Sequence, residues 1–161
     1  GSPGQPAPPP ARVGCDRRYG RAMAEIVVEL PDGDVTPLLP HLDTAAFVNL
    51  HPGVDAEEAP PSGPFGGLFG NRGPVVPLAT WTPGEIGLQH AVGQHVTRFL
   101  AERGVTIPED WYKVAEHPKR GLVLRTYQTP VREVLEWLVR AATATCPLEI
   151  TGPWHAVVHP R

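Results

Sequence analysis

The stretch from Val75 to His159 follows the order strand, helix, strand, strand, helix, strand. Apolar stretches of strand length alternate with two segments that open on Thr-Pro, at Thr82-Pro83 and at Thr129-Pro130. Threonine is a good helix N-cap and proline fits the first helical position, so each dipeptide predicts a helix start. Crossover connections are right-handed, which leaves few arrangements for this order, and the commonest is the ferredoxin-like split βαβ sandwich. The sequence therefore predicts an α+β fold of that type.

Both predicted helices carry an apolar stripe. The first follows a strand over Pro74–Trp81, begins at Thr82 with Glu85 at the third helical position, and ends before Gly104. The second begins at Thr129. The apolar stripe of the first helix is Leu88, Val92, Val96, Phe99 and Leu100. The inward positions of the second helix are Val131, Val134, Leu135, Leu138, Val139 and Ala142.

Further strands are indicated by residue alternation and turn residues. Trp111–His117 and Gly121–Tyr127 predict a hairpin, and Leu148–His159 predicts the last strand. Upstream, Ala24–Leu30 alternates between apolar and mixed positions, which predicts an extra N-terminal strand with one wet face. Ala46–Leu50 predicts another short strand.

Proline and glycine divide the chain. The chain has 21 prolines and 17 glycines among its 161 residues. This is about twice the ordinary usage of the two residues, and both concentrate before residue 75. We expect residues 1–22 to be a disordered Pro-rich tail and residues 23–73 to hold the N-terminal strand and an irregular Pro/Gly-rich arm with a long loop. Residues 74–161 are expected to form the ferredoxin-like core, with residues 23–161 making one domain.

The overall composition excludes several classes. The chain is 41% hydrophobic and has a net charge of -3, which predicts a soluble domain and favours neither nucleic acid nor an acidic membrane surface as a partner. No stretch approaches the ~18 consecutive apolar residues that span a bilayer. The two cysteines, Cys15 and Cys146, form no disulfide framework, and this predicts a cytoplasmic protein.

The seven histidines do not predict a metal site. His90 and His95 lie five apart on the predicted first helix and point to different sides of it. His155 and His159 share a strand face but lie about 13 Å apart at the usual rise per residue. Zinc ligands need to approach the ion within about 2.1 Å, so neither pair can chelate one ion. We expect no metal and no cofactor.

Motifs for catalysis and for RNA binding are also missing from the sequence. The chain has no G-x-S-x-G nucleophile and no phosphate-binding loop ending in G-K-[ST]. The segment Arg120–Tyr127 resembles the RNP1 segment of an RNA-recognition motif only at its ends. Leu122 and Leu124 stand where the stacking aromatic residues would be required, so RNA binding is not predicted.

Strand parity predicts one candidate face. Trp154, Ala156 and Val158 should point towards the helices, so His155 and His159 should point away from them. The expected ligand or partner face consists of Trp81, Arg125, Tyr127, His155 and His159, together with two apolar anchors from the Gly-rich loop, Phe65 and Phe69.

Two functions remain open from the sequence. The favoured hypothesis is a non-catalytic binding or assembly module that uses its open sheet face and N-terminal arm to bind a protein partner or a second copy of itself. It rests on the missing catalytic motifs and on the apolar residues of the arm. The alternative is a small enzyme or small-molecule-binding protein with a pocket between the sheet and the Phe65–Phe69 loop.

Overall fold

The computed structural model describes residues 24–54, 76–93, 95–118 and 121–161. Within them, the strands form one antiparallel seven-stranded sheet in the order β1-β7-β2-β3-β4-β6-β5. The strands are β1 (Ile26–Leu30), β2 (Ala45–Val54), β3 (Leu78–Thr82), β4 (Glu85–Gln89), β5 (Tyr112–His117), β6 (Gly121–Arg125) and β7 (Ile150–Pro160). The helical elements are η2 (Pro31–Gly33), η3 (Thr36–Thr44), α3 (Val96–Glu102) and α4 (Val131–Thr145). The α+β class is confirmed.

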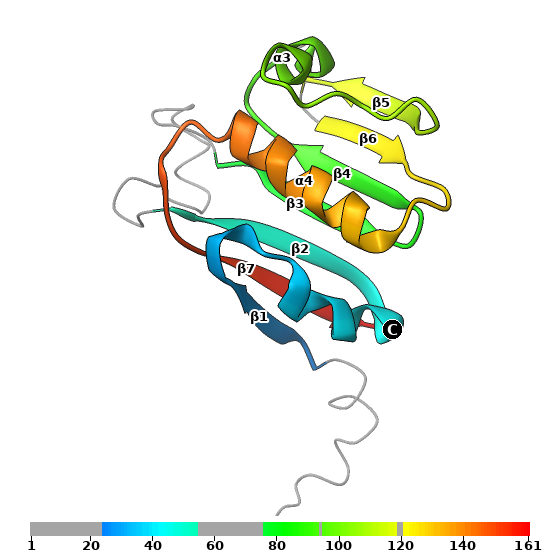
Figure 1. Cartoon of the computed structure of the whole chain (residues 1–161), viewed down its shortest axis with the longest axis vertical. Helices are drawn as coiled ribbons and strands as arrows, with labels where there is room; N and C mark the ends of the chain where they lie inside the picture. Colours follow the sequence, from blue (N-terminus) through cyan, green and yellow to red (C-terminus); the bar gives the residue numbers. More distant parts are fainter. Residues whose placement is uncertain (1–23, 55–75, 94, 119–120) are drawn as a thin grey trace, which may run out of the picture.

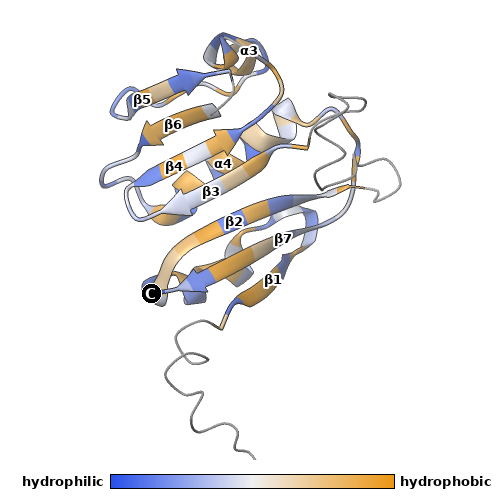
Figure 2. Ribbon diagram, turned by 180° about the vertical axis from the view of Figure 1, so that it is seen from behind, coloured by the Kyte–Doolittle hydropathy of each residue, from blue (hydrophilic) through white to orange (hydrophobic). Residues whose placement is uncertain are grey.

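The helical elements lie on one face of the sheet (Figure 1). The long helix α4 packs across β2, β3 and β4, while η3 packs on β1 and β7 at the other end. Seen from behind, the sheet presents its opposite face with no described helix in front of it (Figure 2). We call this opposite face the open face.

The core lies between α4 and the sheet. The helix buries one stripe along its length: Val134, Leu135, Trp137, Leu138, Ala141, Ala142 and Thr145. Every second residue of the strands faces this stripe, including Leu50, Trp81 and Leu124. Burial of each large apolar side chain stabilises the fold by about 1.5–3 kcal/mol. This contact therefore holds the sheet and the helix together as one unit.

The first predicted helix is wrong over its first half. The residues Thr82-Pro83-Gly84-Glu85 form the turn that joins β3 to β4. Proline followed by a glycine at φ +85° suits a tight turn as well as it suits a helix start, and the Thr82 hydroxyl donates to the Glu85 carbonyl at 3.0 Å. Ile86 and Leu88 are then buried with a period of two residues, which is strand periodicity. The helix begins only at Val96.

The ferredoxin-like topology is not confirmed. The strands β4, β6 and β5 do lie side by side with α3 connecting β4 to β5, which is a split βαβ arrangement. In a ferredoxin-like sheet the last strand would lie beside the first strand of this unit. Here β7 pairs instead with β1 and β2, and β2 and β3 separate it from β4. The extra strand β4 takes up residues that the sequence assigned to a helix, whereas β3 falls mostly within the strand predicted over Pro74–Trp81.

The other predicted elements are confirmed with shifted ends. The hairpin β5–β6, the helix α4 and the last strand β7 all occur. The strand predicted over Ala24–Leu30 is β1, which joins this sheet by pairing with β7. The short strand predicted over Ala46–Leu50 is the ten-residue β2.

Two glycines in neighbouring strands provide a test of the sheet. Gly121 has φ +94°, and a Cβ there would collide with the Leu88 carbonyl oxygen of β4. A non-glycine residue at positive φ costs about 1–3 kcal/mol, and the collision adds to this cost. We expect Gly121→Ala to lower the free energy of unfolding by at least about 2 kcal/mol, measured by urea denaturation.

Gly87 is the matched control. Its φ is not positive, and a Cβ there would meet only the Leu122 carbonyl oxygen, at 3.9 Å. Gly87→Ala is therefore expected to be neutral or to stabilise the protein by up to about 1 kcal/mol. Equal losses in the two variants would contradict the register of β4 and β6.

Candidate functional site

The open face is organised in three rows that run across all seven strands. Antiparallel strands in register place alternate side chains on one face, directly opposite one another. The first polar row is Glu25, His159, Phe47, Thr82, Glu85, Arg125 and Tyr112. The neutral row is Val27, Val157, Asn49, Thr80, Gly87, Val123 and Ala115. The second polar row is Glu29, His155, His51, Leu78, Gln89, Gly121 and His117.

Contacts within the first polar row tie adjacent strands together. The Nδ1 atom of His159 lies 3.2 Å from the Oε2 atom of Glu25. The His159 ring also stacks on Phe47 with 4.1 Å between ring centroids. Further along the row, the Nε atom of Arg125 lies 3.9 Å from the Oε1 atom of Glu85. These exposed pairs contribute little stability each, but they fix where the charges stand on the face.

The neutral row contains no ionisable side chain. Val27 on the edge strand β1 is 63% exposed. In the middle of the row, the Thr80 hydroxyl donates to the Oδ1 atom of Asn49 at 2.8 Å. Gly87 has no side chain, and a hollow of about 180 Å³ lies over it, lined by Thr80, Thr82, Glu85, Ile86, Gly87 and Val123. The row is thus apolar at its ends and hollowed near its centre.

The second polar row brings two histidines together. His51 and His155 are register partners on β2 and β7, and the Nε2 atom of His155 lies 3.9 Å from the Oε2 atom of Glu29. Partial burial of the His51 ring, together with the charge of the adjacent His155, lowers the pKa of His51. Within the described part of the chain, no group of three or more His, Cys, Asp or Glu residues could hold a metal ion.

The structure places only some of the residues expected at the site on the open face, and three strands separate Arg125 on β6 from His155 and His159 on β7. Arg125, His155 and His159 stand on the open face. Trp81 belongs to the core instead, where it is 6% exposed, because β3 turns it towards α4. Tyr127 lies beyond the end of β6 in the loop before α4. The two phenylalanines of the Gly-rich loop, Phe65 and Phe69, lie outside the described residues.

Several residues of the open face were missed in the sequence. Phe47 and Asn49 alternate with the buried Val48 and Leu50, and this signal was present in the chain. The role of Gly87 depended on recognising β4 as a strand. Val27 and Val157 become one continuous apolar edge only through the pairing of β1 with β7.

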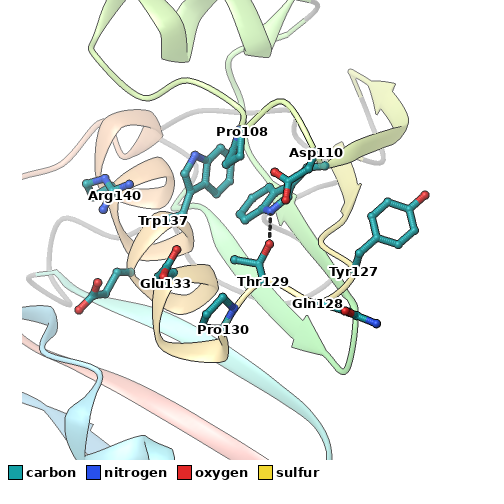
Figure 3. Close-up of a pocket in the computed structure, with 11 residues that line it drawn as sticks. Pro108, Asp110, Tyr127, Gln128, Thr129, Pro130, Glu133, Trp137 and Arg140 are labelled. Atoms are coloured by element: carbon teal, nitrogen blue, oxygen red, sulfur yellow. Dashed lines mark hydrogen bonds between the residues drawn. The ribbon is translucent and has the colours of Figure 1, made fainter.

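A second hollow lies at the start of α4, on the helix-covered side (Figure 3). We call it the tryptophan groove. It has a volume of about 940 Å³. Its lining is Pro108, Asp110, Trp111, Tyr127, Gln128, Thr129, Pro130, Glu133, Glu136, Trp137 and Arg140. The groove therefore collects residues from α4 and from the two loops that precede β5 and α4.

One buried histidine lies outside both surfaces. The Nδ1 atom of His90 accepts a hydrogen bond from the Val92 N–H at 3.1 Å, and its buried Nε2 atom has no partner among the described residues. Burial lowers the pKa of His90, and the charge of Glu116 opposes this only in part. Burial thus favours the neutral form of His90.

The Glu116 carboxylate joins β5 to α3. Its Oε2 atom accepts from both the N–H and the hydroxyl of Thr97, each at 2.9 Å, and its Oε1 atom lies 2.6 Å from Nζ of Lys113. Partial burial of the Glu116 carboxyl raises its pKa, but the hydrogen bonds from Lys113 and Thr97 outweigh burial and lower it to about 2. The ionised form is therefore part of the folded structure.

No family model, curated protein or solved structure matches this chain. No helix of the described residues is long and apolar enough to cross a membrane.

The lowered pKa values of His90 and Glu116 predict stability losses in separate pH ranges. A lowered pKa in the folded state means that the unfolded state binds protons more readily, so stability falls as the pH drops below the unfolded value. For His90 the loss begins below a pH of about 6.5, and for Glu116 it begins below about 4.5 and continues towards 2. We expect His90→Gln to reduce the slope of unfolding free energy against pH between 7.5 and 5.5, as measured by urea denaturation. The part of the slope that comes from His51, whose pKa is also lowered, should remain.

Glu116→Gln serves as the comparison for this measurement. It should leave the slope between pH 7.5 and 5.5 unchanged and should flatten the slope below pH 4.5. A slope in the upper range that is the same in His90→Gln as in the wild type would show that His90 does not contribute to it.

Proposed function

We propose that the protein is a non-catalytic assembly module that uses the open face of its sheet to bind a second copy of the chain. The observation that carries this proposal is the neutral row, which crosses a sheet face that no described helix covers. A bare sheet face that carries apolar side chains and no ionisable group along its middle row is typical of a surface that is covered in an assembly.

The dimensions of the open face favour a protein partner. Its six interstrand spacings of about 4.8 Å make it about 29 Å wide. Three rows of side chains then give a plan area on the order of 600 Å², close to the ~800 Å² that each partner contributes to a standard interface. The hollow over Gly87 has a volume of about 180 Å³, below the ~300 Å³ of small-molecule sites.

The charge distribution favours a second copy. Glu25 and Glu29 flank Val27 at the β1 end of the open face, whereas Arg125 stands at the opposite end, on β6. The central strand is β3. A two-fold axis parallel to the strands and above β3 would reverse the strand order of the facing copy. It would bring the acidic end of each copy towards Arg125 of the other.

The same symmetry matches the neutral rows. Two aligned sheets pack about 10 Å apart with their strands within about 30° of each other. Under this axis β7 of one copy faces β6 of the other, which opposes Val157 to Val123. The strand β2 faces β4, which points Asn49 towards the hollow over Gly87 of the second copy. The valines of the two copies would thus pack on each other, and the Asn49 side chain of each copy would fill the hollow over Gly87 of the other.

The pocket alternative receives no support from the described residues. Its Phe65–Phe69 loop lies outside them, and Trp81, which was expected to line the pocket, is buried in the core. A small-molecule pocket under that loop stays a prediction from the sequence.

The first test measures mass in solution. By size-exclusion chromatography with light scattering, we expect the chain to have twice its monomer mass of 17.4 kDa. Val157→Arg places a charge in the neutral row and should weaken the dimer at least tenfold, because a buried unpaired charge is costly at an interface. Ala101→Arg, on the exposed surface of α3, is the matched control and should remain dimeric. A wild-type chain that stays monomeric at millimolar concentration would exclude the assembly.

A charge exchange tests the orientation. The double variant Glu25→Arg/Glu29→Arg and the variant Arg125→Glu should each dimerise more weakly than the wild type, since like charges would meet at both ends. Mixing the two variants should produce a heterodimer, because arginines of one variant then face acidic residues of the other at both ends of the interface. Failure to form the heterodimer, with both variants folded by circular dichroism, would contradict the two-fold axis proposed here.

A further inference from the structure

The two edges of the sheet differ in how they are protected from pairing with a further strand. The strand order places β1 at one edge and β5 at the other (Figure 2). The register of β5 is broken between Lys113 and Ala115, and irregularities and lysines of this kind discourage the addition of a strand. The pairing of β1 with β7 runs without a break from Ile26 to Leu30, and these residues include no proline, glycine or lysine. Among the described residues, the outer edge of β1 is therefore regular and open.

The open-face side of β1 is apolar at its centre and acidic on both sides of it. Val27 is 63% exposed, and Glu25 and Glu29 flank it at alternate positions on the same face. Each carboxylate has a histidine of β7 on its inner side, His159 at 3.2 Å from Glu25 and His155 at 3.9 Å from Glu29. A strand added on the outer side would complement β1 best with a cation, an apolar residue and a cation at alternate positions.

A second copy of β1 does not have this pattern. Two antiparallel β1 strands centred on Val27 would place Glu25 of each copy opposite Glu29 of the other, and like charges in such pairs are destabilising. Centring the pair on Val28 would place each Glu29 opposite Val27, where the carboxylate gains no partner. The strand that fits this edge is therefore a different one, with positive charges spaced four residues apart.

The chain itself carries such a segment directly before β1. Residues 1–23 lie outside the described residues, and their sequence contains no lysine and four arginines: Arg12, Arg17, Arg18 and Arg21. Of these, only Arg17 and Arg21 are four residues apart, and Tyr19 lies midway between them. The alternate positions of residues 17–21 thus hold a cation, an aromatic ring and a cation.

We propose that residues 17–21 pair with the outer edge of β1 of the same chain as an additional antiparallel strand. The segment directly precedes β1, so it reaches this edge by reversing direction once. Gly20 and Ile26 are the first paired positions, and the five residues between them, 21–25, make a loop of a length that is common in hairpins. The added strand covers the edge of the sheet and leaves the open face free for the assembly proposed above.

Three cross-strand pairs on the open face define the register: Arg21 with Glu25, Tyr19 with Val27, and Arg17 with Glu29. Opposite charges, and an aromatic ring beside a β-branched side chain, are favourable cross-strand pairs. A shift of the added strand by one residue in either direction would leave at most one arginine opposite a carboxylate. The charge pattern therefore selects one register.

Disulfide trapping in the full chain tests this register. Cys15 and Cys146 are first replaced by serine so that no native thiol competes. In that background, Tyr19→Cys/Val27→Cys should form an intramolecular disulfide in more than about half of the molecules on mild oxidation, because directly opposed residues bring their Cβ atoms within disulfide reach. Gly20→Cys/Val27→Cys is the matched control. It should form at least about fivefold less disulfide, since neighbouring residues of a strand point to opposite faces.

The trapping experiment can overturn the proposal in three ways. Equal oxidation of the two variants would show that residues 17–21 have no fixed register on β1. A disulfide that links two chains, seen as a doubled mass on a non-reducing gel, would assign the added strand to a second copy. Absence of a disulfide in Tyr19→Cys/Val27→Cys, with the fold intact by circular dichroism, would exclude the added strand.

Hydrogen exchange measured by NMR tests the charge pairing. The outward amides of β1 should exchange at least about threefold faster in Arg17→Ala/Arg21→Ala than in the wild type, as expected for the loss of two exposed ion pairs. Arg12→Ala/Arg18→Ala removes the same charge from positions that face neither carboxylate, and it should exchange as the wild type does. Equal acceleration in the two variants, or outward amides without protection in the wild type, would overturn the proposal. Both readouts are intramolecular, so they hold whether or not the open face forms a dimer.

Discussion

The packing of α4 across one face of the sheet is the contact on which the rest of the structure depends. One helix of 15 residues buries a single stripe, and the alternate residues of β2, β3 and β4 complete the core against it. Since each strand has only two faces, the residues between those core positions must point the other way. The open face is therefore a direct consequence of where α4 lies.

The same contact places the tryptophan groove. Trp137 belongs to the buried stripe of α4, and its edge-to-face packing against Trp111 joins the middle of the helix to the loop before β5. The chain thus has two surfaces on opposite sides of one core. The open face is broad, with charges at its two ends, and suits another folded surface. The groove has the two buried indoles at its base and acidic side chains among its lining.

Sequence reasoning succeeded where the signal was local and failed where one segment satisfied two patterns. The strong apolar stripe of α4 and the parity of β6 and β7 led to Arg125, His155 and His159 on the side away from the helices. The residues Thr82-Pro83-Gly84-Glu85 fit a helix start and a tight turn equally well. Taking them as a helix start hid β4, and with it the hollow over Gly87 and the true environment of Trp81.

The sequence by itself determined the elements with strong local periodicity: α4, the β5–β6 hairpin, and which residues of β6 and β7 share a face. These depend on the 3.6-residue and two-residue repeats of the backbone. Only the tertiary structure decided that β2 and β3 lie between β7 and β4. Strand pairing joins residues far apart in the chain, and many partners satisfy the same alternation. The rows of the open face and the meeting of Trp111 with Trp137 follow from that choice of partners.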